Sequence, residues 1–103
     1  MAEFVKQGEV NLAGTILYTG GASTILTKII SLRFYNSMAY VLTLERYDAV
    51  TTNSEVIYRL TLDAGDTVTD DLSYALNAGD QITVYSDIPG TTYYVYGIDY
   101  ASS

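Results

Sequence analysis

Apolar and polar side chains alternate along most of this chain, and this period of two limits its possible folds more than any other feature. Successive side chains of a β-strand point to opposite faces of a sheet, so the alternation predicts strands that each turn one face to a core. The clearest runs are residues 24–35, 39–46, 56–62, 81–86 and 91–100. No apolar stripe at helical spacing lasts three turns. The sequence therefore predicts an all-β protein.

The alternation also predicts the face on which each side chain lies. In the long segment 24–35, one face is expected to carry Leu26, Lys28, Ile30, Leu32 and Phe34. In the next segment, one face is expected to carry Tyr40, Leu42 and Leu44. Each set should keep to one face of its strand.

Turn-forming residues separate these runs at the spacing that is typical of an all-β sandwich. The clearest are Gly20-Gly21, Asn36-Ser37, residues 51–54 and Ile88-Pro89-Gly90. We expect about seven or eight strands, near residues 4–10, 15–19, 24–35, 39–46, 56–62, 67–74, 80–86 and 91–100. They predict a single antiparallel β-sandwich, either a jelly roll or immunoglobulin-like. This domain would cover residues 14–103, with residues 1–13 as an N-terminal arm or edge strand.

A five-residue phrase occurs twice, as LDAGD at residues 62–66 and as LNAGD at residues 76–80. Asp and Asn side chains bond to their own backbone two residues on, and Gly accepts a positive φ, so both copies predict turns between strands. A calcium site is the alternative, and it would use Asp63, Asp66 and Asp80. Neither copy has the spacing of an EF-hand loop, which favours the turns.

The composition suits one small domain. A chain of 103 residues that is 49% apolar and 17% charged can bury a core. It has no cysteine, which excludes disulfides and thiolate metal sites. No run approaches the roughly 20 apolar residues of a membrane-spanning helix, and the first ten residues lack the apolar core of a signal peptide. We expect a soluble chain made in the cytosol, without a membrane partner.

The net charge of −7 is unevenly distributed. From Leu60 onward there is no basic residue, whereas the acidic residues there are Asp63, Asp66, Asp70, Asp71, Asp80, Asp87 and Asp99. Such a field repels phosphate backbones, so we expect no direct binding to nucleic acid. It leaves three alternatives open: a calcium site, a basic partner, or a solvated acidic rim.

Catalytic residue types are scarce. The chain lacks histidine and cysteine, the commonest general base and thiol nucleophile. Carboxylates such as Asp70, Asp71 or Glu45 could serve a glycosidase, but a small sandwich has little room for a deep cleft. We therefore expect no enzymatic activity, no catalytic residue, no cofactor and no metal.

Tyrosine is abundant, with 11 residues in the chain. In the segment 91–103, tyrosines point to both faces of one predicted strand, so they cannot all lie in the core. Tyrosine buries a large ring while its hydroxyl stays hydrated, and it is enriched at protein interfaces. The candidate interface residues are Tyr93, Tyr94, Tyr96 and Tyr100. The alternatives are half-buried sheet faces and stacking platforms for sugars.

Several phrases occur in an order that suggests a known group of proteins. They are Leu17-Tyr18-Thr19 before a Gly-rich turn, the long strand 24–37 that ends near Asn36, the phrase LNAGDQITVYS at 76–86, and the last strand from Tyr93 to Gly97. In this order the chain resembles the small β-sandwich decoration or accessory proteins of tailed-bacteriophage virions. It departs from their pattern at Gly20-Gly21-Ala22, where Pro-Ala-Gly would be expected.

The resemblance implies a non-enzymatic virion structural protein, made in the host cytoplasm. The first role that it implies is that of a capsid decoration (cement) protein, which stabilises the head by binding between capsomers. Its implied partners are further copies of itself, as a homotrimer, and the major capsid protein or another virion protein. The alternatives are a tail, baseplate or fibre component, or a stand-alone carbohydrate-binding module. For a chain that associates with its own copies, we expect residues 1–10 and 91–103 to form sheet edges and the N-terminal arm to reach a neighbour.

Overall fold

The computed structural model describes residues 1–22 and 24–101, and this part of the chain is built from strands. They are β1 (Ala2–Glu9), β2 (Thr15–Thr19), β3 (Thr24–Tyr35), β4 (Tyr40–Asp48), β5 (Asn53–Leu62), β6 (Thr67–Asp70), β7 (Tyr74–Leu76), β8 (Gln81–Ser86) and β9 (Thr92–Ala101). No helix occurs among the described residues, which confirms the all-β prediction. For those residues there is accordingly no helix that could cross a membrane.

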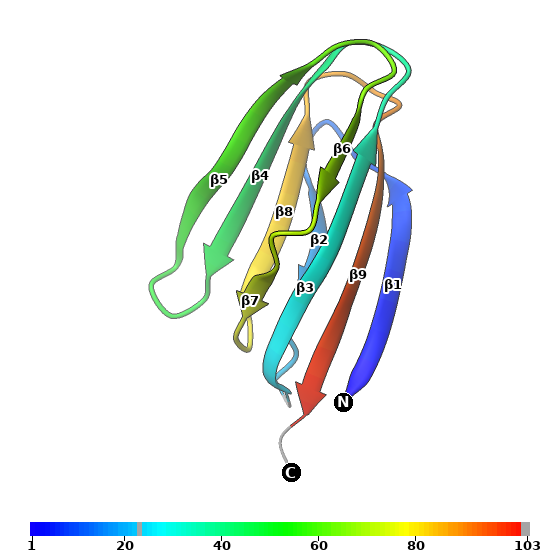
Figure 1. Cartoon of the computed structure of the whole chain (residues 1–103). Helices are drawn as coiled ribbons and strands as arrows, with labels where there is room; N and C mark the ends of the chain where they lie inside the picture. The colour runs from blue at the N-terminus through cyan, green and yellow to red at the C-terminus, as the bar shows by residue number, and fades with distance from the viewer. Residues whose placement is uncertain (23, 102–103) are drawn as a thin grey trace.

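The strands form two antiparallel sheets that pack face to face (Figure 1). Sheet A has the order β1-β9-β3-β6, and β7 pairs with β3 beyond the end of β6. Sheet B has the order β2-β8-β4-β5. The prediction of a single antiparallel β-sandwich is confirmed.

The core lies between the two sheets. It is formed by inward side chains of both sheets, and in strands such as β4 and β8 alternate residues are buried. The buried apolar residues are Val10, Leu17, Ile29, Leu32, Phe34, Tyr40, Leu42, Leu44, Val68, Leu76, Ile82, Val84 and Val95. Their removal from water is the main favourable contribution to folding.

A β-bulge in β3 changes the face on which its side chains lie. The pairing of β3 with β9 shifts register between Ile29 and Ser31. Because the bulge adds one residue, Ile29 and Leu32 both face the core and are fully buried, whereas Lys28 is exposed. The prediction that Lys28, Ile30 and Leu32 share one face is therefore wrong. A strict period of two does not survive an inserted residue.

The predicted strand at 67–74 is divided into β6 and β7. The chain leaves the sheet at residues 71–73, where Leu72 is exposed and Ser73 has a φ of 68°. This left-handed conformation is uncommon for a residue with a side chain, and it ends the regular pairing. The described residues therefore form nine strands instead of seven or eight.

The prediction that residues 91–103 form a sheet edge is wrong. The strand in this segment, β9, lies between β1 and β3 and pairs with both. Residues 102 and 103 lie outside the described residues. Residues 2–9, by contrast, do form an edge strand, because β1 pairs with β9 alone. This segment is held against its own domain along its whole length.

Two tyrosine–carboxylate bridges connect the sheets. On one side, Asp99 of β9 accepts hydrogen bonds from the Tyr18 hydroxyl of β2 and the Thr27 hydroxyl of β3. Burial and the bond to Asp99 raise the pKa of Tyr18 to about 12. Phe4 stacks on the Tyr18 ring at a centroid distance of 3.9 Å and covers this bridge.

On the opposite side, Asp70 of β6 accepts hydrogen bonds from the hydroxyls of Tyr58 in β5 and Tyr74 in β7, each at 2.7 Å. Burial and the bonds to Asp70 raise the pKa of both tyrosines. Both hydroxyls therefore stay protonated at neutral pH and act as donors.

The two LxAGD phrases form turns. In each, the N–H of the final Asp donates to the carbonyl three residues earlier, over 3.1 Å from Asp66 to Asp63 and 3.0 Å from Asp80 to Asn77. Gly65 and Gly79 have φ values of 81° and 83°. Glycine is needed at both positions because other residues are strained there.

Candidate interaction surface

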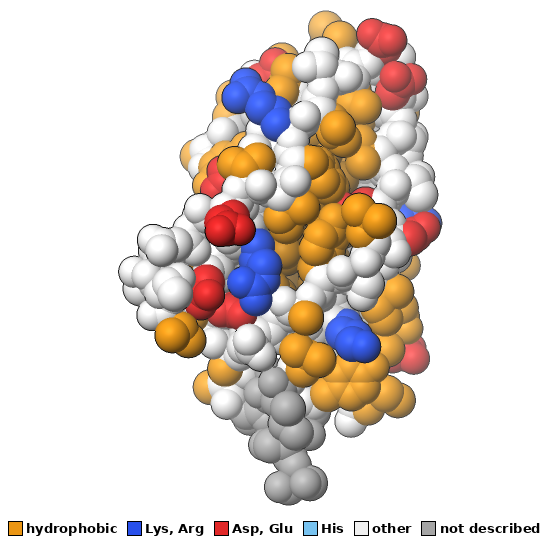
Figure 2. Space-filling view, turned by 60° about the vertical axis from the view of Figure 1, so that its left-hand side comes forward, with side chains coloured by type: hydrophobic (Ala, Val, Ile, Leu, Met, Phe, Trp, Pro, Cys, Tyr) orange, Lys and Arg blue, Asp and Glu red, His pale blue; other side chains and the backbone are white. Residues whose placement is uncertain are grey.

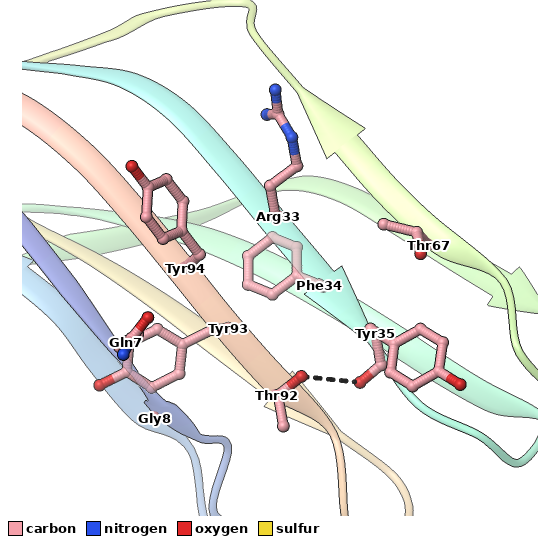
Figure 3. Close-up of a pocket in the computed structure, with 9 residues that line it drawn as sticks. All are labelled: Gln7, Gly8, Arg33, Phe34, Tyr35, Thr67, Thr92, Tyr93 and Tyr94. Atoms are coloured by element: carbon pink, nitrogen blue, oxygen red, sulfur yellow. Dashed lines mark hydrogen bonds between the residues drawn. The ribbon is translucent and has the colours of Figure 1, made fainter.

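The four candidate interface tyrosines lie on β9, and the structure divides them between its two faces. Val95, which is fully buried, shows which face is inward. Tyr93 shares this inward face, packs against the core and lies beside Gly8 (Figure 3). Tyr94, Tyr96 and Tyr100 lie on the opposite, outer face of sheet A. Three of the candidates are thus brought together, and Tyr93 belongs to the fold.

The neighbouring strands extend this outer surface. In the register of sheet A, Tyr96 lies between Val5 of β1 and Ser31 of β3, and Ile98 lies between Glu3 and Lys28. Directly opposed side chains of adjacent strands contact one another. We call Val5, Tyr94, Tyr96, Ile98 and Tyr100 the tyrosine face. Val5 is 56% exposed, so the surface is open to solvent at the β1 edge.

Charged groups border the tyrosine face. Asp71 accepts bonds from Arg33 at 2.9 Å and from the Ser31 hydroxyl at 3.0 Å, and these contacts lower the pKa of Asp71. Both partners are well exposed, so the pair adds little to stability. Partial desolvation and the carboxylate of Glu3 raise the pKa of Tyr96, which keeps its hydroxyl protonated at neutral pH.

A shallow depression of about 520 Å³ lies at one end of this surface (Figure 3). Its walls include Gln7, Arg33, Tyr35 and Tyr94, and Figure 3 shows Arg33 and Tyr94 pointing to the same side of the sheet. Of the described residues that line it, Arg33 alone is charged. The depression offers aromatic and hydrogen-bonding groups, but no pair of acid and base.

The carboxylates that could have served a glycosidase do not converge. Asp70 points inward to Tyr58 and Tyr74, whereas Asp71 pairs with Arg33 on the outer face of sheet A. Glu45 lies on sheet B, beside a separate depression that also includes Tyr47. These side chains therefore do not form a two-carboxylate site.

The acidic turns do not form a metal centre either. Among the described residues, no group of three or more acidic side chains is placed to hold a metal ion. Asp80 accepts bonds from Arg46 at 2.7 Å and from the N–H groups of Ala49 and Asn77 at 2.9 Å each. Its carboxylate is committed to the fold, whereas the side chain of Asp66 is exposed.

An apolar groove, which the sequence reasoning missed, lies along the open side between β5 and β6. It measures about 470 Å³ and is lined by Tyr58, Leu60, Val68 and Leu72, among others. Figure 2 shows hydrophobic side chains gathered along the middle of this side. Leu72, in a turn and 76% exposed, is the one local signal in the sequence that could have revealed it.

Comparison with known proteins gives a similarity in fold alone. No family model matches the chain, and no curated protein matches it. Among solved structures, it is similar to a chain of the Bacillus endospore appendages, which form a novel family of disulfide-linked pili. The TM-score is 0.54 at 12% sequence identity, over 99% of this chain and 87% of the other. The two chains share a β-sandwich architecture.

Proposed function

We propose that this chain is a non-enzymatic structural protein that binds further copies of itself and a larger assembly. The observation that carries the proposal is the tyrosine face, where Tyr94, Tyr96 and Tyr100 lie together on the outer side of a sheet. Tyrosine combines a large apolar ring with a hydrated hydroxyl, the property that enriches it at interfaces. A surface built in this way gains contacts when a partner covers it.

The similarity to a pilus subunit supports this proposal at the level of the fold. The endospore appendages are linked by disulfides. This chain has no cysteine, so its copies would have to associate through non-covalent contacts. Backbone pairing at sheet edges and burial of aromatic side chains are the means that a β-sandwich offers.

The finer proposal comes from the resemblance to tailed-bacteriophage proteins. On this proposal the chain is a capsid decoration protein in the virion that binds the major capsid protein or another virion protein, and a trimer is the arrangement that the resemblance implies. A tail, baseplate or fibre role is the alternative within the particle. The depression beside Tyr35, Tyr94 and Arg33 favours a second candidate, a carbohydrate-binding module, because sugars stack on aromatic rings and bond to such polar groups.

Light scattering as a function of concentration tests self-association. We expect an oligomer at micromolar concentration, and Tyr96→Ser should weaken association by about tenfold, a change of about 1.4 kcal/mol. Tyr47→Ser is the matched control, because Tyr47 is a half-buried tyrosine on the outer face of sheet B. Equal effects of the two substitutions would argue against the tyrosine face.

Binding to assembled capsids and to a glycan array separates the finer alternatives. A decoration protein should co-sediment with capsids that lack it and should not bind to the glycan array. The proposal would be overturned if the protein stayed monomeric, did not bind capsid or tail proteins, and bound glycans. That result would support the carbohydrate-binding module.

A further inference from the structure

The four free edges of the two sheets differ in how well they are protected against pairing. An exposed edge presents unpaired N–H and C=O groups, and proteins protect such edges by short strands, bulges or charges. The edge β2 has 5 residues and a register shift, and β6 and β7 have 4 and 3 residues. The long edge β5 is bulged, because its pairing with β4 shifts register between Leu44 and Glu45. Three edges are therefore blunted.

The fourth edge, β1, is long and regular. It has 8 residues, and its pairing with β9 runs without a register shift from Ala2 to Glu9. The one proline of the chain, Pro89, lies elsewhere. The remaining protection of β1 is charge. Glu3 and Glu9 lie on its outer face, and Lys6 points inward, with its ammonium group 5.6 Å from the Tyr18 ring centroid of its own domain. Among the edges of the described residues, β1 is the one best suited to pair with another strand.

We propose that β1 pairs antiparallel with β1 of a second copy, across a two-fold axis at Val5, so that sheet A continues from one copy into the next. This inference rests on the proposed self-association, and it names a dimer contact in place of the trimer that the resemblance implies. It gives a closed, two-fold interface, in which the same surface of each copy is used.

The register follows from the faces of the strand. In an antiparallel pair, directly opposed side chains lie on the same face of the sheet. If the outer faces of both copies are to form one surface, one residue must therefore lie opposite its own equivalent at the two-fold axis. An axis at Lys6 would place two ammonium groups opposite each other, and an axis at Phe4 would shorten the overlap. An axis at Val5 pairs residues 2–8 of both copies and places Glu3 opposite Gln7 and Phe4 opposite Lys6. No like charges are then opposed.

The contact also extends the tyrosine face across the axis. Val5 is opposite Tyr96 within its own sheet, so pairing at Val5 would create one apolar stripe from Tyr96 of one copy to Tyr96 of the other. Val5, now 56% exposed, would be covered. Beside it, the amide of Gln7 could donate to the carboxylate of Glu3 from the second copy.

Cysteine cross-linking tests both the contact and the register, because the natural chain contains no cysteine. A residue at the two-fold axis lies opposite the same residue of the second copy, at a Cα separation of about 4.5–5.5 Å, which suits a disulfide. Val5→Cys should therefore give a covalent dimer upon mild oxidation. Val56→Cys is the control, since Val56 is a valine of similar exposure, 59%, on the bulged edge β5, and it should cross-link at least tenfold more slowly.

A mixed experiment fixes the register. Glu3→Cys and Gln7→Cys should each cross-link poorly alone and should form a heterodimer when mixed, because the two positions are opposed. Val5→Lys, which opposes two positive charges, should raise the dissociation constant about tenfold or more while the circular dichroism spectrum stays unchanged. Light scattering of the natural chain separates the possible failures. If the natural chain associates but Val5→Cys cross-links slowly, the β1 contact is wrong and the proposed self-association stands. If the natural chain is strictly monomeric, both proposals are wrong.

Discussion

The turns at residues 62–66 and 76–80 are written with almost the same letters but have different structural roles. Each is a tight turn with a glycine at positive φ in its third position. In the first turn, the Asp66 side chain is exposed, and a Cβ added to Gly65 would meet nothing within 4 Å. In the second, Asp80 is 2% exposed and accepts three hydrogen bonds.

Both turns bond to distant parts of the chain through their backbones, the first from the Gly65 N–H to the carbonyl of Asn36 at 3.0 Å. In the second turn, the side chain of the final Asp makes such bonds as well. Backbone bonds connect this turn to Gly20, at 2.8 Å from Gly79 and 2.9 Å to Asp80. Arg46, which is bonded to Asp80, also donates to the carbonyl of Ala75. The sequence of a turn therefore specifies its backbone conformation. The surrounding residues decide whether its side chains are buried and stabilise the fold.

Removal of the carboxylate should produce the largest difference between the two turns. Asp80→Ala removes the acceptor of two part-buried N–H groups and the carboxylate partner of Arg46, which keeps its bonds to Ala75. This should cost about 3 kcal/mol of unfolding free energy. Asp66→Ala should change it by less than about 0.5 kcal/mol. Urea denaturation followed by circular dichroism measures both. If the two variants lost equal stability, the distinction between the turns would be wrong.

The glycines should show a smaller difference. Gly65→Ala should cost about 1–2 kcal/mol from the left-handed backbone alone. Gly79→Ala should cost about 1 kcal/mol more, since its new Cβ would lie 2.9 Å from the Cβ of Ala49. Thermal unfolding of each variant measures these losses.

A double-mutant cycle identifies the source of the extra loss. Ala49→Gly removes the opposing methyl group and should recover the excess in the Gly79→Ala background, with no recovery in the Gly65→Ala background. If the Gly65→Ala background recovered as much, the contact with Ala49 would not be the cause.

The dependence of stability on pH should show the smallest difference. Burial of Asp80 works in the opposite direction, but the N–H groups of Ala49 and Asn77 and the charge of Arg46 outweigh it and lower the pKa of Asp80. A lowered pKa contributes stability above the unfolded pKa of about 3.9, and this stability is lost as the pH falls through the folded pKa. Melting temperatures between pH 7 and pH 2.5 should thus fall less steeply for Asp80→Asn than for the natural chain. An equally steep fall for Asp80→Asn and the natural chain would contradict this.

Local patterns predicted the strands well. Alternation at 39–46 correctly placed Tyr40, Leu42 and Leu44 on one face, and in 91–100 it correctly divided the tyrosines between two faces. A period of two is a property of the single strand. The prediction was wrong at β3, where the bulge near Ile30 reverses the faces. A bulge depends on the pairing with β9, and no single strand carries a clear sign of it.

The candidate surface was predicted only in part. The excess of tyrosine in 91–103 pointed to the right strand, and alternation separates Tyr93 from Tyr94 and Tyr96. The position of that strand within the sheet could not be derived, since it depends on which strands are neighbours. For the same reason the regular edge of β1 became visible only in the sheet topology.

The central position of β9 in sheet A has a consequence for how the protein is made. Synthesis proceeds from the N-terminus, so β1 and β3 leave the ribosome long before the strand that joins them. Sheet B is complete once β8 has emerged at Ser86, but β1 has no partner in its own chain until residues 92–101 follow. Such distant pairing makes folding slow. It also delays the ordering of the β1 edge until β9 is in place, so a growing chain would not yet present the strand through which finished copies pair.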